Sequence, residues 1–181
     1  MNNRYSFSGG AQGEWRVTRQ GIYRGQGLAP VQRVAVRPGV EAGPSGALWT
    51  LTGVVSNVRY ATAAELKALA TKQEGLGRPE AKCAALIPIK KSQRWWNLAQ
   101  DERRRIFEET SHHNAIGMDY LPAIARRLHH CRDLGGDFDF LTWFEYAPNH
   151  ADAFEELVVR LRRSPEWEYV EREVDLRLER N

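Results

Sequence analysis

The sequence has few cysteines and no long apolar run. Only two cysteines, Cys83 and Cys131, occur among the 181 residues. A pair this sparse is typical of buried, reduced thiols rather than of a disulfide-stabilised secreted scaffold. No stretch has the roughly 20 apolar residues of a membrane span, and no secretory hydrophobic segment is present. We therefore expect a cytoplasmic protein with no membrane partner.

An excess of one charge sign is also lacking. The chain has 26 basic and 23 acidic residues, which give a formal net charge of +3. This near-balance gives little support to nucleic-acid binding, and we expect no nucleic-acid partner. Between Arg4 and Arg37 there are six arginines and one acid, Glu14. Few aromatic residues accompany them, which favours a solvated face or an interface segment over an RNA-binding arm.

Hydrophobic patterning predicts several strands. Residues 1–13 are polar and rich in glycine, which predicts a poorly ordered end or one that lies over a partner. Strands are predicted at residues 31–37, 47–58, 83–89, 138–146 and 170–178. The last of these alternates apolar and charged residues, so we expect one of its faces in solvent.

Helix signals lie between these strands. Thr62 and Glu65 form a capping box that predicts a helix over residues 63–73, and residues 100–110 predict a surface helix. Asn149 is expected to cap a further helix that ends near Ser164. The resulting order of elements predicts an α+β fold of the ferredoxin-like type.

The stretch Ser111–Arg132 holds two residues suited to one site. His113 and Arg126 are 13 residues apart, which on one continuous helix would separate them by about 20 Å and turn them to opposite sides. Gly117 and Pro122 predict a break in the helix. We expect an imidazole from one helical segment and a guanidinium from the next to face one cavity.

The residues alone allow other interpretations of these histidines and charged side chains. A pair of histidines such as His112 and His113 is commonly a helix-end cap, and Lys91 and Glu166 by themselves read as surface charges. Zinc binding by Cys83, Cys131 and histidines lacks a recognised ligand spacing.

Several consecutive motifs nevertheless carry a resemblance. In chain order, these are LTGVVSN, LGRPEAKCAALIPIKKS, QDERR, CRDLG, FDFLTWFEYAP and EWEYVEREVDLRL, all between Leu51 and Arg180. Together they resemble the chlorite dismutase family, in its short-chain, dimeric lineage. The resemblance implies two ferredoxin-like halves that form a barrel-like core with outer helices, the dimeric α+β barrel. Residues 1–80 would be a reduced N-terminal half, and residues 81–181 the half that binds haem.

The resemblance also implies a site. His113 would be the axial ligand of the iron of haem b, with Glu166 accepting its second N–H and Lys91 holding that carboxylate ionised. Arg126 would hold the substrate oxyanion, and Gln73 would orient the Arg126 side chain.

Further residues are expected to line the haem. These are Tyr60, Ile87, Leu121 and the Trp95–Trp96 pair. Within the pair, Trp96 is the one expected to contact the cofactor. For Tyr60, Ile87 and the tryptophans, ordinary core packing is an equally good interpretation. The implied activity converts chlorite to chloride and O₂ through a ferryl and hypochlorite intermediate, in a homodimer.

Three other functions remain open. A coproheme decarboxylase does not use the arginine seen here, and a peroxidase of the dye-decolorising type would carry a GxxDG-like distal motif that the sequence lacks. A non-catalytic haem-binding protein is the third. Arg127 is the alternative to Arg126, because neighbouring side chains on a helix diverge by about 100° and only one can face the cavity.

Overall fold

The computed structural model describes residues 3–39, 43–55 and 60–181. Within these ranges the chain forms a closed barrel of eight antiparallel strands in the order β1-β3-β2-β8-β5-β7-β6-β4. The strands are β1 (Arg4–Gly10), β2 (Trp15–Arg24), β3 (Arg33–Pro38), β4 (Trp49–Val55), β5 (Cys83–Lys91), β6 (Ile124–His130), β7 (Phe140–Tyr146) and β8 (Val170–Glu179). The expected α+β barrel-like fold with outer helices is confirmed.

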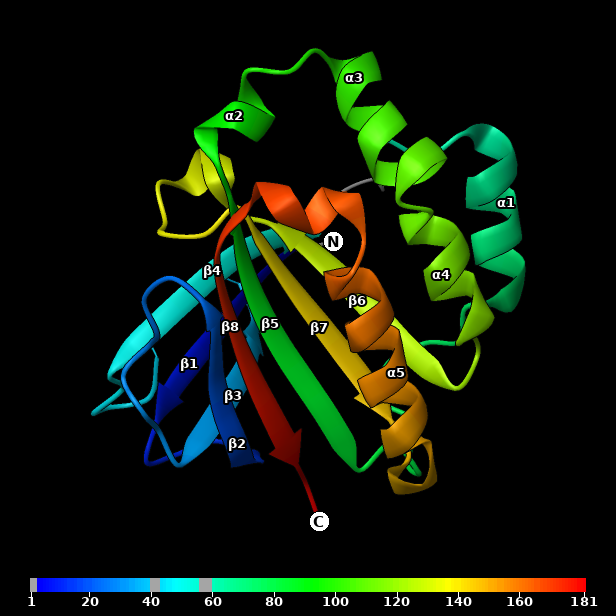
Figure 1. Cartoon of the computed structure of the whole chain (residues 1–181). Helices are drawn as coiled ribbons and strands as arrows, with labels where there is room; N and C mark the ends of the chain where they lie inside the picture. The colour runs from blue at the N-terminus through cyan, green and yellow to red at the C-terminus, as the bar shows by residue number, and fades with distance from the viewer. Residues whose placement is uncertain (1–2, 40–42, 56–59) are drawn as a thin grey trace.

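The helices lie outside the barrel on one side of it (Figure 1). They are α1 (Ala63–Lys72), α2 (Gln93–Trp96), α3 (Gln100–Arg104), α4 (His113–Asp119) and α5 (Ala151–Arg162). Shorter turns are the π-helical η1 (Arg105–Thr110) and the 3-10 turns η2 (Arg132–Leu134), η3 (Pro148–His150) and η4 (Pro165–Tyr169). Figure 1 shows α4 and α5 beside the C-terminal strands, with β1 to β3 on the far side. None of the helices in the described ranges has both the length and the apolar character needed to cross a bilayer.

Most predicted elements are present. Strands β3, β4, β5 and β7 cover the predicted positions, although the end of the second prediction, residues 56–58, lies outside the described residues. The capping box of α1 is confirmed: the Thr62 backbone N–H donates to Glu65 Oε2 at 2.6 Å, and the Glu65 N–H donates to Thr62 Oγ1 at 3.3 Å. The helix that follows Asn149 begins one residue later than expected, with His150 at its N-cap.

Residues 4–10 form a strand, so the predicted poor order is wrong for them, and the alternative, that this segment lies over a partner, stays a prediction. Strand β1 pairs with both β3 and β4, and Phe7 is fully buried. The glycine content has a packing reason, because a Cβ on Gly9 would lie 2.2 Å from the ring of Trp49. Strand β2 was not predicted, because irregularities in its register against β8 interrupt the alternation of apolar and polar residues.

The C-terminal strands have a core on each face. On β5, Ala84 and Leu86 face the barrel interior, whereas Ala85, Ile87 and Ile89 face the helices. Helix α5 covers this outer face with apolar residues at helical spacing: Phe154, Leu157, Val158 and Leu161. Each such buried side chain contributes roughly 1.5–3 kcal/mol relative to exposure. The sheet is therefore packed on both sides.

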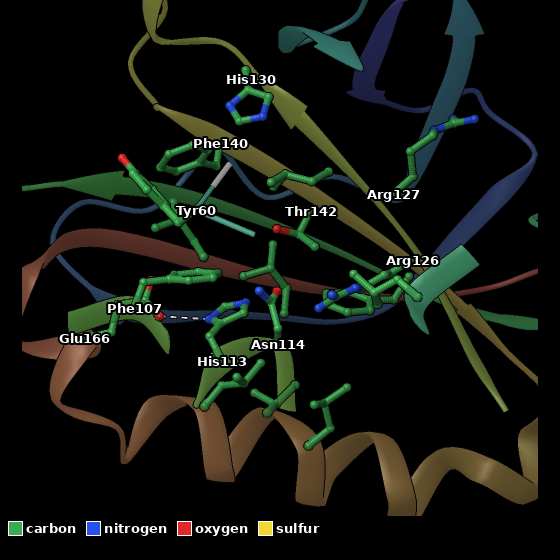
Figure 2. Close-up of a pocket in the computed structure, with 18 of the residues that line it drawn as sticks. Tyr60, Phe107, His113, Asn114, Arg126, Arg127, His130, Phe140, Thr142 and Glu166 are labelled. Carbon is green, nitrogen blue, oxygen red and sulfur yellow. Dashed lines mark hydrogen bonds and ion pairs between the residues drawn. The ribbon is translucent and has the colours of Figure 1, made fainter. Parts of the chain in front are cut away.

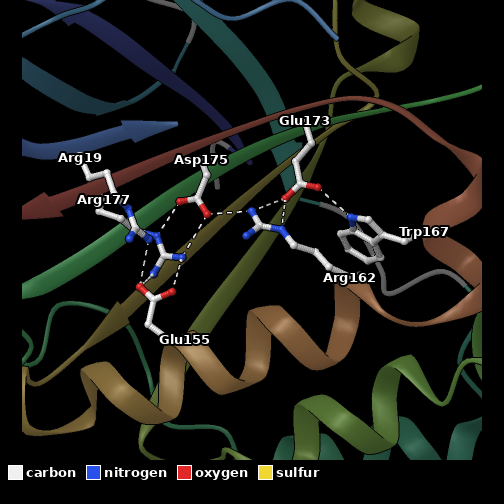
Figure 3. A network of polar contacts seen from close by, with 7 residues as sticks. All are labelled: Arg19, Glu155, Arg162, Trp167, Glu173, Asp175 and Arg177. Atoms are coloured by element: carbon white, nitrogen blue, oxygen red, sulfur yellow. Dashed lines mark hydrogen bonds and ion pairs between the residues drawn. The ribbon is translucent and has the colours of Figure 1, made fainter. Parts of the chain in front are cut away.

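Strand β8 is buried from Glu173 to Leu178 and is exposed at Glu171 and Glu179 near its ends, so the prediction of one face in solvent was wrong for most of the strand. Its charged residues Glu173, Asp175 and Arg177 are buried under α5. Arg162 of α5 donates to Glu173 at 2.5 Å and to Asp175 at 2.7 Å, and Arg177 pairs with Asp175 at 2.5 Å (Figure 3). The alternation of charge along β8 reflects a buried ion network rather than exposure.

We predict that Arg162→Ala lowers the free energy of unfolding by about 3 kcal/mol, because it leaves the buried Glu173 carboxylate without its cation. Urea denaturation at neutral pH measures this. Arg16→Ala is the matched control, since its pair with Glu179 has side chains that are 59% and 49% exposed. The control is expected to change stability by less than about 1 kcal/mol. Equal effects from the two variants would contradict the assignment.

Candidate active site

A cavity of about 380 Å³ lies outside the barrel, between the outer face of β5, β6 and β7 and the helices α1, α4 and α5. Its volume is in the range of small-molecule and cofactor sites. The walls are mainly apolar and include Leu69, Ile87, Ile89, Leu128, Phe144, Leu157, Val158 and Leu161. Figure 2 shows polar side chains entering this space from α4 and from β6.

A chain of three polar residues closes one side of the cavity. Lys91 Nζ lies 2.6 Å from Glu166 Oε1, and His113 Nδ1 lies 2.7 Å from Glu166 Oε2. The elements bring them together from distant parts of the sequence: Lys91 ends β5, His113 begins α4, and Glu166 lies in η4. The period of two along β5 places Lys91 on the same outer face as Ile87 and Ile89.

The carboxylate of Glu166 is ionised although it is buried. Burial alone would raise its pKa, but the charge of Lys91 and the hydrogen bonds from Lys91 and His113 outweigh burial and lower the pKa to about 2. An ionised Glu166 fixes the Nδ1–H tautomer of His113, because a carboxylate can only accept a hydrogen bond. The other ring nitrogen, Nε2, is then free to bind a metal ion, and the hydrogen bond increases its basicity.

Two aromatic rings fix the plane of the His113 imidazole. Phe107 of η1 stacks on it with ring centroids 4.4 Å apart and an interplanar angle of 22°. Trp167, next to Glu166, is nearly parallel at 6.3 Å and 15°. The hydrogen bond to Glu166 therefore fixes the direction of the imidazole, and the two rings fix the orientation of its plane.

The other histidines are placed differently. His112 is exposed, and it enters α4 with φ of 53°. His129 faces the barrel interior, where burial lowers its pKa to about 4 and its Nδ1 contacts the Leu141 carbonyl. His130 also lines the cavity, and Figure 2 shows it far from Arg126. Of the described histidines, His113 is the one that lines the cavity beside a buried carboxylate.

Arg126 faces the same cavity, but from a strand. The prediction of a second helix after Pro122 was wrong: α4 ends at Asp119 and the chain turns into β6. Successive residues of a strand point to opposite faces. Arg126 therefore points into the cavity, whereas the Arg127 guanidinium lies over the Tyr5 ring, 3.8 Å from its centroid (Figure 2).

The Arg126 guanidinium has no ion-pair partner within the described ranges. Burial lowers its pKa below the ordinary value, partly offset by the charge of Glu108. Because the ordinary pKa of arginine exceeds 12, the group remains a cation. An unpaired cation in a mainly apolar cavity is suited to bind an anion.

Gln73 contacts Arg126 in a different way from the prediction. Its Nε2 donates to the backbone carbonyl of Arg126 at 2.8 Å, not to the guanidinium. Gln73 follows directly after α1, so this hydrogen bond ties α1 to strand β6. The residue lines the cavity but fixes the backbone of Arg126 rather than its side-chain orientation.

The remaining predicted residues separate into two groups. Tyr60 and Ile87 line the cavity. Trp96 and Leu121 are not among the lining residues: Trp96 turns away and its Nε1 donates to Asp139 at 3.1 Å, and Leu121 lies in the turn before β6. Trp95 takes the lining position instead.

Thr142 and Asn114 line the cavity but were not predicted to, whereas Trp95 belonged to the predicted tryptophan pair. Thr142 and Trp143 are neighbours on β7, and successive residues of a strand point to opposite faces. Because Trp143 faces the barrel interior, Thr142 lies on the outer face, where it lines the cavity. Trp95 and Asn114 are buried, and neither Trp95 Nε1 nor Asn114 Nδ2 has a hydrogen-bond partner among the described residues. Unpaired buried donors are rare in proteins, so a ligand in the cavity is expected to supply acceptors.

A family model described as chlorite dismutase matches residues 42–179. The chain belongs to the chlorite dismutase family. A dimeric chlorite dismutase from Nitrobacter winogradskyi is 53% identical, with a TM-score of 0.90 over 97% of this chain and 99% of that one. The chlorite dismutase of Candidatus Nitrospira defluvii in complex with imidazole is 28% identical, with a TM-score of 0.58 over 72% of this chain and 54% of that one.

A curated chlorite dismutase from Ideonella dechloratans is 36% identical over 86 residues. The match covers 48% of this chain and 28% of that protein, so the chain spans less than a third of this relative. Chlorite dismutases are haem-dependent, and the cavity offers apolar walls and an imidazole, His113, that is oriented by a buried carboxylate, which suit such a cofactor.

We predict that Glu166 contributes stability that is lost in acid. Its folded pKa of about 2 lies below the ordinary 4.5, so its contribution is full above pH 4.5 and is lost as the pH falls toward 2. A shift of this size corresponds to roughly 3 kcal/mol. Chemical denaturation of wild type and Glu166→Gln across this range measures it: wild type should lose stability more steeply than the variant. Parallel profiles would contradict the ionised, buried carboxylate.

Proposed function

We propose that this protein is a haem b-dependent chlorite dismutase that converts chlorite to chloride and O₂. The observation that carries the proposal is the pairing, in one apolar cavity, of an imidazole anchored by a buried carboxylate with an unpaired guanidinium. The close relative from Nitrobacter winogradskyi supports it, because the two chains correspond over nearly their whole lengths.

The residues fit a haem. His113 would hold the iron through Nε2, and the Glu166–Lys91 pair would keep the imidazole oriented and basic. The N–H groups of Trp95 and Asn114, which have no partner among the described residues, offer donors to an acidic cofactor such as one with propionates. When bound, the haem supplies the iron chemistry that cleaves the Cl–O bond of chlorite and forms the O–O bond.

Arg126 supplies the anion site. Its guanidinium remains charged after chlorite is converted to hypochlorite, so it can retain this second anion in the cavity. Retention raises the effective concentration of hypochlorite where the O–O bond is made. The apolar walls exclude water and strengthen the attraction between the guanidinium and either anion.

The carboxylates of the cavity favour chlorite over peroxide as the substrate. Cleavage of peroxide generally benefits from an acid–base group, whereas chlorite gives up an oxygen atom without proton delivery. Among the described lining residues the carboxylates are Glu166 and Glu173, and each is engaged by a cation, Lys91 or Arg162. Neither is available as a distal acid.

Two structural assignments accompany the proposal. Residues 81–181 form the haem-binding half, and the preceding half contributes Tyr60, Leu69 and Gln73 to the cavity wall. The protein is a homodimer, and the description of the relative from Nitrobacter winogradskyi as dimeric supports this.

We predict that Arg126→Ala lowers O₂ release from chlorite by at least about 100-fold, because one charge-assisted anion contact contributes roughly 3 kcal/mol. The haem remains bound, since Arg126 is not the iron ligand. An oxygen electrode measures the rate per haem. Arg127→Ala is the control, because this residue also lines the cavity but its guanidinium lies over the Tyr5 ring. Loss of activity in the control alone would overturn the assignment.

We predict that His113→Ala loses haem during purification, whereas His130→Ala retains it, because the buried Glu166 carboxylate orients His113 as the iron ligand. The visible absorption spectrum after reconstitution measures occupancy. If wild-type protein binds haem but releases no O₂ from chlorite, the proposed activity fails while the haem site stands.

A further inference from the structure

Helix α4 contains a glycine where an alanine would form a better helix. Gly117 lies in its interior and is buried. Glycine destabilises a helix interior relative to alanine, so its presence there calls for a compensating reason. The described surroundings offer one: a Cβ on Gly117 would lie 2.7 Å from Arg126 Nη1 and 3.2 Å from Cζ.

The absent Cβ therefore leaves room for the Arg126 guanidinium to lie against α4. The nearest atoms to that Cβ all belong to the end of the Arg126 side chain. Such an end can move, so a larger residue at position 117 would displace the guanidinium rather than disrupt the fold. In contrast, a Cβ on Gly9 would meet the rigid ring of Trp49.

The spacing along α4 links this contact to His113. Gly117 is four residues after His113, and residues at this spacing lie on the same face of a helix, one turn apart. One face of α4 thus carries the imidazole anchored by Glu166 and, one turn later, the surface that receives the guanidinium. Gln73 fixes the Arg126 backbone from the other side.

We propose that Gly117 is a positioning residue that sets the place of the Arg126 guanidinium relative to His113, and thereby the affinity of the cavity for small anions. The positioning role of Gly117 rests on the proposed function only where chlorite is named as one of the small anions that the cavity binds. Any residue with a side chain at position 117 pushes the guanidinium off α4 and away from the position that holds the anion.

The first test measures anion affinity. Nitrite, a small oxyanion, is titrated into haem-loaded ferric protein and followed by the visible spectrum. Gly117→Ala is expected to weaken nitrite binding about 10-fold and to raise the KM for chlorite similarly, with a smaller change in kcat. Gly136→Ala is the matched control, because a Cβ there meets nothing within 4 Å. The control is expected to match wild type.

The second test needs neither haem nor activity. Gly117→Ala is made in wild type and in Arg126→Ala, and thermal unfolding of the apoprotein is measured. With the arginine side chain removed, the added methyl group has room and the better helix former should raise Tm by roughly 2 °C. In wild type the same change should give no increase, because it displaces Arg126.

The outcomes separate the two proposals. Unchanged nitrite affinity in Gly117→Ala, or the same change in Tm in both backgrounds, would overturn the role of Gly117. A 10-fold loss that persists in the Arg126→Ala background would also overturn it, since the effect would not pass through the guanidinium. If wild type releases no O₂ from chlorite but the nitrite titration and the thermal unfolding give the expected results, the chlorite proposal fails and the positioning role stands.

Discussion

The ion pair between Lys91 and Glu166 is the interaction on which the site depends. Both side chains are about 5% exposed or less, so each charge would be strongly disfavoured without the other. Lys91 of the strand binds one oxygen of Glu166, and the other oxygen binds His113 of the helix. The ion pair thereby fixes the direction of the imidazole. Without the Glu166 carboxylate, the ring would lose the charged acceptor that fixes its tautomer.

The barrel contributes because the helices and the cavity cover most of the outer face of its C-terminal strands. Side chains that point inward fill the interior, and those that point outward either pack under α5 or line the cavity. Trp167 joins these two regions: its ring lies parallel to His113, and its Nε1 donates to Glu173 at 2.7 Å. The buried ion network under α5 and the cavity therefore share a wall.

The sequence predicted those features that depend on local chemistry. The capping box at Thr62 and the apolar spacing along α5 each act within one element, and both are found in the structure. Strand β1 was missed because its burial depends on closing the barrel through β3 and β4, which no local pattern encodes. The charged residues of β8 were misread for a related reason, since α5 supplies their counter-charge from elsewhere in the chain.

The candidate site shows the same division. The resemblance to a family indicated His113, Glu166 and Lys91, whose meeting from three distant segments could not be derived from spacing. The preference for Arg126 over Arg127 assumed that both residues lie on a helix. They lie on strand β6, where successive side chains point to opposite faces. Trp95 and Trp96 are adjacent in a four-residue helix, and only the three-dimensional structure distinguishes which one faces the cavity.

The position of β8 in the barrel affects when the cavity can form. This strand hydrogen-bonds to β2 on one side and to β5 on the other, and it directly follows the turn that holds Glu166. During synthesis all other walls of the cavity leave the ribosome before it. The pocket can therefore acquire its shape, and accept a bound group, only after nearly all of these residues have been translated.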